Sequence, residues 1–217
     1  DYLRHLADTV YINDVVERHR VKNRLELEEL LRIIASSIGA PSNPTKLSNT
    51  FKSLKNIVIS NKTLGNYLNY LCDAFMIGRA VRYNIKGKKY INTLSKYYFT
   101  DIGLRNALLD FRQTEQTHIM ENVIYNELLY RGYSVDVGIV EVTGHDKNGK
   151  FIRKQLEVDF VVNDGSQRYY IQSAFSIPDE EKMSQETASF RYIDDSFKKI
   201  LVVKDDIMPY TDDNGFL

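Results

Sequence analysis

The sequence predicts an α+β chain in which a helical segment and a winged helix are followed by a mixed sheet flanked by helices. Two observations predict this class. Apolar residues recur with helical spacing from residue 2 to about residue 75, and the pattern then changes to the alternation of strands. The second half gives the order helix, three strands, helix, strand, which is typical of a mixed sheet covered by helices.

The composition is that of a globular protein, with 43% hydrophobic and 27% charged residues among 217. No apolar run approaches the roughly 18 residues that a membrane crossing needs, and the first residues lack the pattern of a signal peptide. A cytoplasmic location without membrane contact is therefore expected. Cys72 is the only cysteine, which excludes an intrachain disulfide and a cysteine-rich zinc site.

The net charge of zero is the sum of two opposite halves. Residues 1–110 hold 17 Lys and Arg against 10 Asp and Glu, and residues 111–217 hold 12 against 19. Between Ser36 and Lys96, ten basic residues face a single acid, Asp73. Such a segment favours a polyanion as its partner.

Residues 2–38 have the periodicity of two helices, and residues 39–44 then break the pattern with two prolines. A short helix is expected at 45–54 and a longer one from residue 62 to about 75, with Ser60 or Asn61 as its N-cap. The apolar band expected to face the core in the first region consists of Leu25, Leu27, Leu30, Leu31, Ile33 and Ile34.

Residues 80–85 alternate in polarity, residues 86–88 turn the chain, and residues 89–91 return it, which predicts a basic β-hairpin. A further extended piece at 96–100 precedes a short helix capped by Thr100 or Asp101. Helices followed by a hairpin are the order of a winged helix, predicted here for residues 39–112. Residues 1–38 form a separate helical segment, and residues 113–217 form the last domain.

The basic winged helix predicts double-stranded DNA as a partner, because its third helix enters the major groove while the hairpin touches the backbone. The alternative is that these lysines and asparagines are ordinary solvated side chains. The predicted contacts are Lys62, Asn66 and Asn69 on the helix and Arg82, Lys86, Lys88 and Lys89 on the wing.

The acidic half is expected to begin with a helix at 113–131 that ends at Gly132. Strands are expected near 134–142, 153–162, 168–175 and 199–203, with a helix at about 179–193 between the last two. The side chains expected inside the first helix are Ile119, Val123, Ile124, Leu128 and Leu129.

Three residues of this half have the chemistry of a metal-dependent phosphodiesterase. Asp159 lies in a strand, Gln172 lies in the next strand, and Glu121 lies between apolar residues of the long helix. Phosphodiester hydrolysis with Mg²⁺ needs oxygen ligands for the metal and a basic group to position water. Glu121, Asp159 and Gln172 are therefore the candidate catalytic residues, and Glu121 and Asp159 the candidate metal ligands.

The arrangement of Glu121, Asp159 and the strand 172–174 resembles the PD-(D/E)xK nuclease superfamily, whose fold is restriction-endonuclease-like. The runs 96–105, 157–160 and 170–172 are in addition similar to a C-terminal domain of unknown function attached to prokaryotic AAA-type ATPases. This resemblance covers nearly the whole chain. It implies a restriction-endonuclease-like domain at 113–217, and an N-terminal ATPase domain as a further partner.

Two departures from these families bear on function. No phosphate-binding loop occurs, so ATP is expected only in an ATPase domain outside these residues. Where an active nuclease carries lysine, this chain has Ala174, and Lys154 is the alternative source of an amine. Loss of the group that activates water typically removes about 10²- to 10⁴-fold of rate.

The predicted function is that of a DNA-binding, regulatory C-terminal module of an AAA-type ATPase with a degenerate nuclease-like domain. No cofactor is expected unless the nuclease is active, in which case Mg²⁺ is required. The alternatives are a Mg²⁺-dependent DNA nuclease and a protein-interaction module. In the latter, the acidic half docks a basic partner or the basic half of a second copy, which would give a homo-oligomer.

Overall fold

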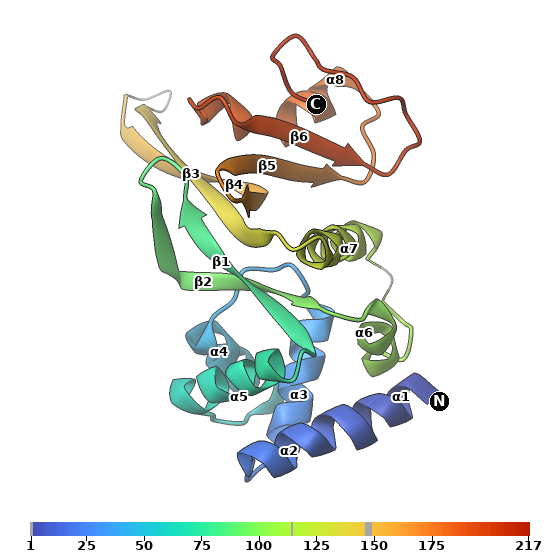
Figure 1. Ribbon diagram of the computed structural model, residues 1–217. Coiled ribbons are helices and arrows are strands. Elements are labelled where there is room, and N and C mark those ends of the chain that lie inside the picture. Colours follow the sequence, from blue (N-terminus) through green and yellow to red (C-terminus); the bar gives the residue numbers. More distant parts are fainter. Residues whose placement is uncertain (1, 114, 146–148) are drawn as a thin grey trace. The chain divides into compact units, whose positions relative to one another are not determined.

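The computed structural model describes residues 2–113, 115–145 and 149–217 (Figure 1). The chain forms two compact units, each assembled from segments that are distant in sequence. Unit 1 takes the residues up to Arg79 together with Leu94–Asn122, and unit 2 takes Ala80–Thr93 together with Val123–Leu217.

Unit 1 begins with the two helical segments that the sequence predicts for residues 2–38. The first contains a π-helical stretch, and its parts are α1 (Tyr2–Leu6), η1 (Ala7–Ile12) and α2 (Asn13–His19). The second is α3 (Arg24–Ser36), whose buried face is formed by Leu27, Leu30, Leu31 and Ile34. Leu25 was expected in this apolar band, but its side chain is 75% exposed. Because it precedes Leu27 by two positions, it lies on the opposite side of the helix.

Two further helices of unit 1 follow, α4 (Pro44–Lys55) and α5 (Asn61–Asp73). The side chain of Asn43 accepts a hydrogen bond from the amide of Lys46 at 2.8 Å, and Ser60 accepts one from the amide of Thr63 at 3.0 Å. Ser60 is therefore the N-cap of α5, one of the two residues predicted for that role. Figure 1 shows α3, α4 and α5 grouped together.

The end of α3 is held by an arginine from α6 (Ile102–Leu108). The fully buried Arg105 donates from Nε to the carbonyl of Ala35 at 2.8 Å and from Nη1 to the carbonyl of Gln113 at 2.7 Å. Burial lowers the pKa of its guanidinium. Asp101, one of the two residues predicted for this role, caps the helix by accepting from the amide of Leu104 at 3.0 Å.

The described residues contain one mixed sheet of six strands in the order β2-β1-β3-β4-β5-β6. β1 pairs with β3 and β5 with β6 in parallel, whereas β3, β4 and β5 are antiparallel. The predicted mixed sheet is confirmed in this general form. The strands are β1 (Ile77–Asn84), β2 (Lys89–Phe99), β3 (Ser134–His145), β4 (Phe151–Asp164), β5 (Gln167–Ala174) and β6 (Lys198–Val203).

Two elements differ from the expectation. β2 is one continuous strand where two extended pieces were predicted, because residues 92–95 between them are extended as well. The helix expected at 179–193 is reduced to α8 (Glu180–Glu186) and the 3₁₀ turn η2 (Phe190–Tyr192). Thr187 and Ser189 interrupt it, because the amide of Phe190 donates to the carbonyl of Thr187 in the tighter 3₁₀ pattern.

The long helix α7 (Gln116–Tyr130) buries only part of the face that was predicted, with Leu128 buried and Ile119 packed against the core of unit 1. Val123 and Leu129 were expected inside but are 51% and 40% exposed. Asn122 is fully buried instead, since its amide group donates to the carbonyl of Phe99 at 2.7 Å and accepts from the Phe99 amide at 2.8 Å. The polar anchor Asn122 therefore sets the rotation of the helix.

The compact units are a different division from the predicted boundaries at residues 38 and 112. The hairpin tip, assigned by sequence to the winged helix, belongs to unit 2, and β1, β2 and α7 each contribute to both units. The expected junction at 112–115 includes Thr114, which lies outside the described residues. Whether residues 1–38, 39–112 and 113–217 fold independently of one another therefore stays a prediction.

No helix in the described part of the chain has the length and apolarity that a membrane crossing requires.

Candidate functional site

Asp159 lies in unit 2 at the point where β4 and β5 separate. The two strands pair from Asp164↔Gln167 to Phe160↔Ile171. Beyond Ile171, β5 continues beside β6 as far as Ala174, while β4 continues beside β3. Asp159 and Gln172 are the first residues past the last pair of β4 and β5, Phe160↔Ile171, so we call this place the strand fork.

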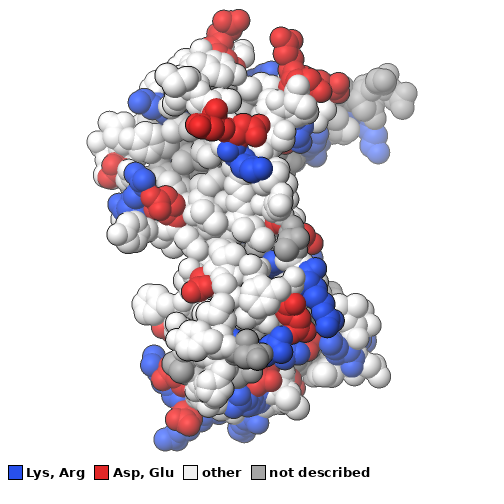
Figure 2. Space-filling model, turned by 90° about the vertical axis from the view of Figure 1, so that its right-hand side faces the viewer, with Lys and Arg blue, Asp and Glu red and all other residues white. Residues whose placement is uncertain are grey.

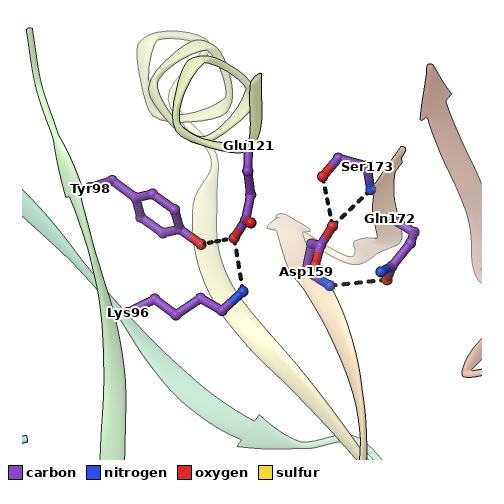
Figure 3. A network of polar contacts seen from close by, with 6 residues as sticks. All are labelled: Lys96, Tyr98, Glu121, Asp159, Gln172 and Ser173. Carbon is purple, nitrogen blue, oxygen red and sulfur yellow. Dashed lines mark hydrogen bonds and ion pairs between the residues drawn. The ribbon is translucent and has the colours of Figure 1, made fainter. Parts of the chain in front are cut away.

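Side chains replace backbone pairing at the strand fork (Figure 3). Asp159 Oδ2 accepts from the amide of Ser173 at 2.8 Å and from its hydroxyl at 2.7 Å. Gln172 Oε1 in turn accepts from the amide of Asp159 at 3.3 Å. The structure therefore brings Asp159 and Gln172 together, as predicted. It adds Ser173, whose role the sequence signals only by its place between Gln172 and Ala174.

No amine is supplied to the strand fork by the two positions that the sequence singled out. Ala174 is buried and pairs with Val203. Lys154 was considered as a replacement from another strand, but it lies in β4 itself, five residues before Asp159 and paired with Val142. At the rise of a β-strand this places the two residues about 16 Å apart. That alternative was wrong, because Lys154 and Asp159 lie in the same strand and not in two different ones.

Glu121 lies in unit 1, where its carboxylate is engaged by two side chains of β2 (Figure 3). Its Oε1 accepts from Lys96 Nζ at 2.8 Å and from the hydroxyl of Tyr98 at 2.6 Å. All three residues are buried, so the charges of Lys96 and Glu121 balance each other away from water. Gly39, with φ +71°, allows the backbone to pass close to this carboxylate, since a Cβ there would lie 3.3 Å from it.

Lys96 and Tyr98 were not predicted as site residues. Their spacing shows that they share a side of the strand, because residues two apart in a strand point the same way, but it does not show that they meet Glu121. Tyr98 is fully buried, and its hydroxyl is hydrogen-bonded to Glu121. The carboxylate of Glu121, which was predicted to be catalytic, is thus hydrogen-bonded to Lys96 and Tyr98 within unit 1.

A metal site would need several oxygen or nitrogen ligands in one place. Across residues 2–113, 115–145 and 149–217, no group of three or more His, Cys, Asp or Glu side chains is placed to hold a metal ion. Of the two predicted ligands, Glu121 is salt-bridged to Lys96 and Asp159 is hydrogen-bonded to Ser173. Their assignment as metal ligands stays a prediction.

The predicted DNA contacts on α5 lie on its exposed side. Lys62, Asn66 and Asn69 are exposed, whereas the opposite side of the helix buries Leu64, Tyr67, Leu68 and Leu71. Asn69 Oδ1 accepts from Arg79 Nη1 at 3.3 Å. All of these residues belong to unit 1.

The predicted contacts on the wing belong to unit 2. Lys86, Lys88 and Lys89 are exposed around the turn between β1 and β2. Arg82 is half-buried, and its Nε has no hydrogen-bond partner in the part of the chain that the structure describes. The surface predicted as one winged helix is thus distributed over both compact units.

The charge asymmetry along the sequence does not produce one continuous basic surface on the face drawn in Figure 2. On the face drawn in Figure 2, Lys and Arg side chains are interspersed with Asp and Glu side chains. Some basic side chains are also neutralised by ion pairs: Lys55 Nζ lies 2.9 Å from Glu29 Oε1.

Comparison with known proteins gives a family and two uncharacterised relatives. Residues 1–115 match the model of a domain of unknown function, DUF8612. An uncharacterised protein of Haemophilus influenzae is 34% identical over 200 residues, covering 92% of this chain and 46% of that protein. The uncharacterised protein MJ1544 of Methanocaldococcus jannaschii is 29% identical over 182 residues, covering 84% and 38%. The chain thus spans less than half the length of these relatives.

Among solved structures, the crystal structure of protein VC1899 from Vibrio cholerae aligns with this chain. The alignment covers 83% of this chain and 48% of the VC1899 chain. The identity is 14% and the TM-score 0.26.

Proposed function

This chain belongs to the DUF8612 family, a domain of unknown function, and from that premise we propose that it binds double-stranded DNA through helices α4 and α5 of unit 1. One observation carries the proposal. α5 buries one side in the core of unit 1 and presents Lys62, Asn66 and Asn69 on the other. Asparagine amides can pair with adenine edges in the major groove, and lysine binds phosphate or guanine.

The arrangement around α5 supports this role. The connection between α4 and α5 is short, as in helix-turn-helix proteins. The segment before α4 pairs with β2 through a bridge between Ser42 and Ser95, with amide-to-carbonyl distances of 2.8 Å in both directions. The region thus contains α3, the bridged segment, α4, α5 and the pair of strands β1 and β2, in this order. Because a winged helix has the same order of helices and hairpin, we propose that this region is one.

A fluorescence titration with duplex DNA at two salt concentrations tests the proposal. We expect affinity to fall as salt rises, because lysine–phosphate contacts release counterions. Lys62→Gln should lower the slope of log affinity against log salt by about 0.9. Asn66→Ala should cost about 1–3 kcal/mol on a preferred sequence, if it reads a base.

The matched control is Lys204→Gln, which removes an exposed lysine of unit 2. It should leave the affinity and the salt slope unchanged. Duplex binding that is insensitive to salt, or equal effects of Lys62→Gln and Lys204→Gln, would contradict binding through α5.

The competing proposal is a Mg²⁺-dependent nuclease, for which the sequence predicts Glu121, Asp159 and Gln172 as the catalytic residues. It is favoured by the burial of two acidic residues, since Glu121 in unit 1 and Asp159 in unit 2 are each 8% exposed. Incubation of plasmid DNA with Mg²⁺ or Mn²⁺ tests it, with Asp159→Ala as the control. Cleavage by the original chain that the substitution abolishes would support the nuclease, and equal cleavage by both would point to contamination.

We propose for the whole protein that this chain serves as a regulatory C-terminal module of an AAA-type ATPase, with the nuclease-like domain in a binding role. The resemblance of residues 96–105, 157–160 and 170–172 supports this, and the relatives have more than half of their length outside the matched region. ATP hydrolysis by the full-length Haemophilus influenzae relative, with and without duplex DNA, is the measurement. A rate unchanged by DNA would contradict regulation through this module.

A further inference from the structure

Aromatic and basic side chains gather around the turn between β1 and β2 in unit 2. The rings of Tyr83 and Tyr90 meet edge to face, with centroids 5.4 Å apart. The guanidinium of Arg168 lies 5.1 Å from the centre of the Tyr83 ring, and Lys86 Nζ lies 5.9 Å from that of Tyr192. We call the exposed members of this group the hairpin surface: Lys86, Lys88, Lys89, Tyr90 and Tyr192.

Two tyrosine rings of the hairpin surface are open to solvent. Tyr90 is 58% and Tyr192 41% exposed, whereas Tyr170 of the same unit is fully buried. An exposed aromatic ring offers a flat face on which an unpaired base can stack. Bases inside a duplex do not present their faces in this way.

Hydrogen bonds fix the position of Tyr90 in the hairpin surface and of Arg168, which lies next to it. The Tyr90 hydroxyl donates to Asp136 Oδ2 at 3.1 Å, and Arg168 Nε donates to Asn163 Oδ1 at 2.9 Å. Burial raises the pKa of the Asp136 carboxyl, while Tyr90 and Arg168 act in the opposite direction. Because Tyr90 is fixed at its hydroxyl end, stacking on its ring costs little further ordering.

The local charge favours a polyanion. Lys86, Lys88 and Lys89 are all exposed. Two carboxylates of unit 2 are engaged by other groups: Asp195 accepts from Tyr170 at 2.5 Å and lies 3.8 Å from Lys199, and Glu141 pairs with Arg153. The hairpin itself carries three lysines and no acidic residue between Asn84 and Ile91.

We propose that the hairpin surface binds single-stranded DNA, with bases stacked on Tyr90 and Tyr192 and phosphates beside Lys86, Lys88 and Lys89. Exposed aromatic rings combined with basic side chains are the chemistry of sequence-tolerant single-strand binding. The proposal rests on the proposed function only in its choice of DNA over RNA. Its residues are separate from those of α5, so the two sites can fail independently.

Fluorescence anisotropy of a labelled twelve-nucleotide oligothymidine tests the proposal on the full chain. Tyr90→Ala and Tyr192→Ala should each weaken binding roughly tenfold, the loss expected for one stacked base. Tyr90→Phe keeps the ring and should stay within about twofold of the original affinity. The matched control is Tyr210→Ala, which removes a tyrosine that is 55% exposed elsewhere in unit 2 and should change nothing.

Each outcome distinguishes the two sites. Loss of oligothymidine binding in the tyrosine variants, with duplex binding and the melting temperature retained, supports the proposal. Lys62→Gln should retain oligothymidine binding even where duplex binding fails. No binding of oligothymidine at low salt, or equal losses in Tyr90→Ala and Tyr210→Ala, would overturn it. Tighter binding of twelve-nucleotide oligouridine than of oligothymidine would overturn the choice of DNA.

Discussion

At the strand fork, a single carboxylate takes the place of missing backbone pairing. Asp159 Oδ2 accepts both the amide and the hydroxyl of Ser173, and Asp159 itself is buried. Asp159→Ala leaves these donors without their acceptor, so we expect a loss of about 1–3 kcal/mol in the free energy of unfolding. Urea denaturation measures it. Asp164→Ala, at an exposed position in the same strand, is the control and should be nearly neutral.

Ser173→Ala removes one donor while keeping the Asp159 carboxylate, so the expected loss is smaller, about 0.5–1.5 kcal/mol. If Asp159→Ala proved no less stable than the original chain, the carboxylate would not serve the fold, and its burial would need a functional explanation.

Gly138 lies at a β-bulge of β3, where no other side chain fits. A Cβ there would lie 2.8 Å from Val158 Cβ and from Val161 Cγ2, and 2.9 Å from Ile85 Cδ1. We expect Gly138→Ala to cost about 1–3 kcal/mol by overpacking. Gly144→Ala in the same strand meets nothing within 4 Å and should be neutral or slightly stabilising. Thermal melts of both variants compare them, and equal melting temperatures would contradict the close packing at Gly138.

Cys72 on α5 should react slowly with thiol reagents. Burial raises the pKa of its thiol from 9.0 to about 11. At pH 8 the thiolate fraction is then about 100-fold lower than in an ordinary cysteine, and the reaction with a disulfide reagent should be slower in proportion. Because the folded chain holds the proton more tightly than the unfolded chain, this group's contribution to stability falls as pH rises from about 9 to 11. Fast reaction at pH 8, unchanged by urea, would contradict the burial.

At the scale of elements, substitutions of Ser60, the N-cap of α5, can change the stability of the chain and its binding of duplex DNA in different directions. Ser60→Ala removes the hydrogen bond to the Thr63 amide and should cost about 1 kcal/mol. Ser60→Asp restores a capping oxygen and should restore stability. The new negative charge lies two residues from Lys62, so the same variant should weaken duplex DNA binding. Parallel melts and duplex titrations test this, and Ser60→Asp binding as tightly as the original chain would count against α5 as the DNA-contacting helix.

The sequence predicted most elements but not the places where polar side chains override apolar periodicity. The helices α3, α4 and α5 follow their apolar spacing and their caps, and the strands of unit 2 follow alternation. In α7 the prediction placed Val123 inside, whereas Asn122 is buried because it pairs with the backbone of Phe99. Such a long-range bond leaves no periodic signal.

The same reason applies to the candidate site. Asp159 and Gln172 could be predicted to be neighbours because they lie in consecutive antiparallel strands. Lys96 and Tyr98 could not be assigned to Glu121, because 23 residues or more separate them from it in the chain. Ser173 was overlooked because alternation alone assigns its side chain away from Gln172, and only the separation of β4 from β5 lets it reach Asp159.

At the scale of the whole molecule, the sheet of unit 2 depends on strands that come before the predicted boundary at residue 112. β1 pairs with β3 from Arg82↔Val137 to Asn84↔Ile139, and the amide of Ile85 donates to the carbonyl of Ile139 at 3.0 Å. Ile85 also belongs to the buried core of this unit. A fragment of residues 113–217 would expose this edge of β3 together with the fully buried Val137 and Ile139.

We therefore expect the 113–217 fragment to aggregate or to lack a cooperative melt, and a fragment of residues 77–217, which retains β1 and β2, to recover the sheet. Amide dispersion in a proton–nitrogen correlation spectrum and thermal melting by circular dichroism compare the two fragments with the full chain. A monomeric 113–217 fragment that melts cooperatively would establish the boundary at residue 112 and make the hairpin dispensable for the sheet. Failure of 113–217 alongside recovery in 77–217 would mean that the hairpin carrying Lys86, Lys88 and Lys89 is structurally part of the sheet that holds Asp159.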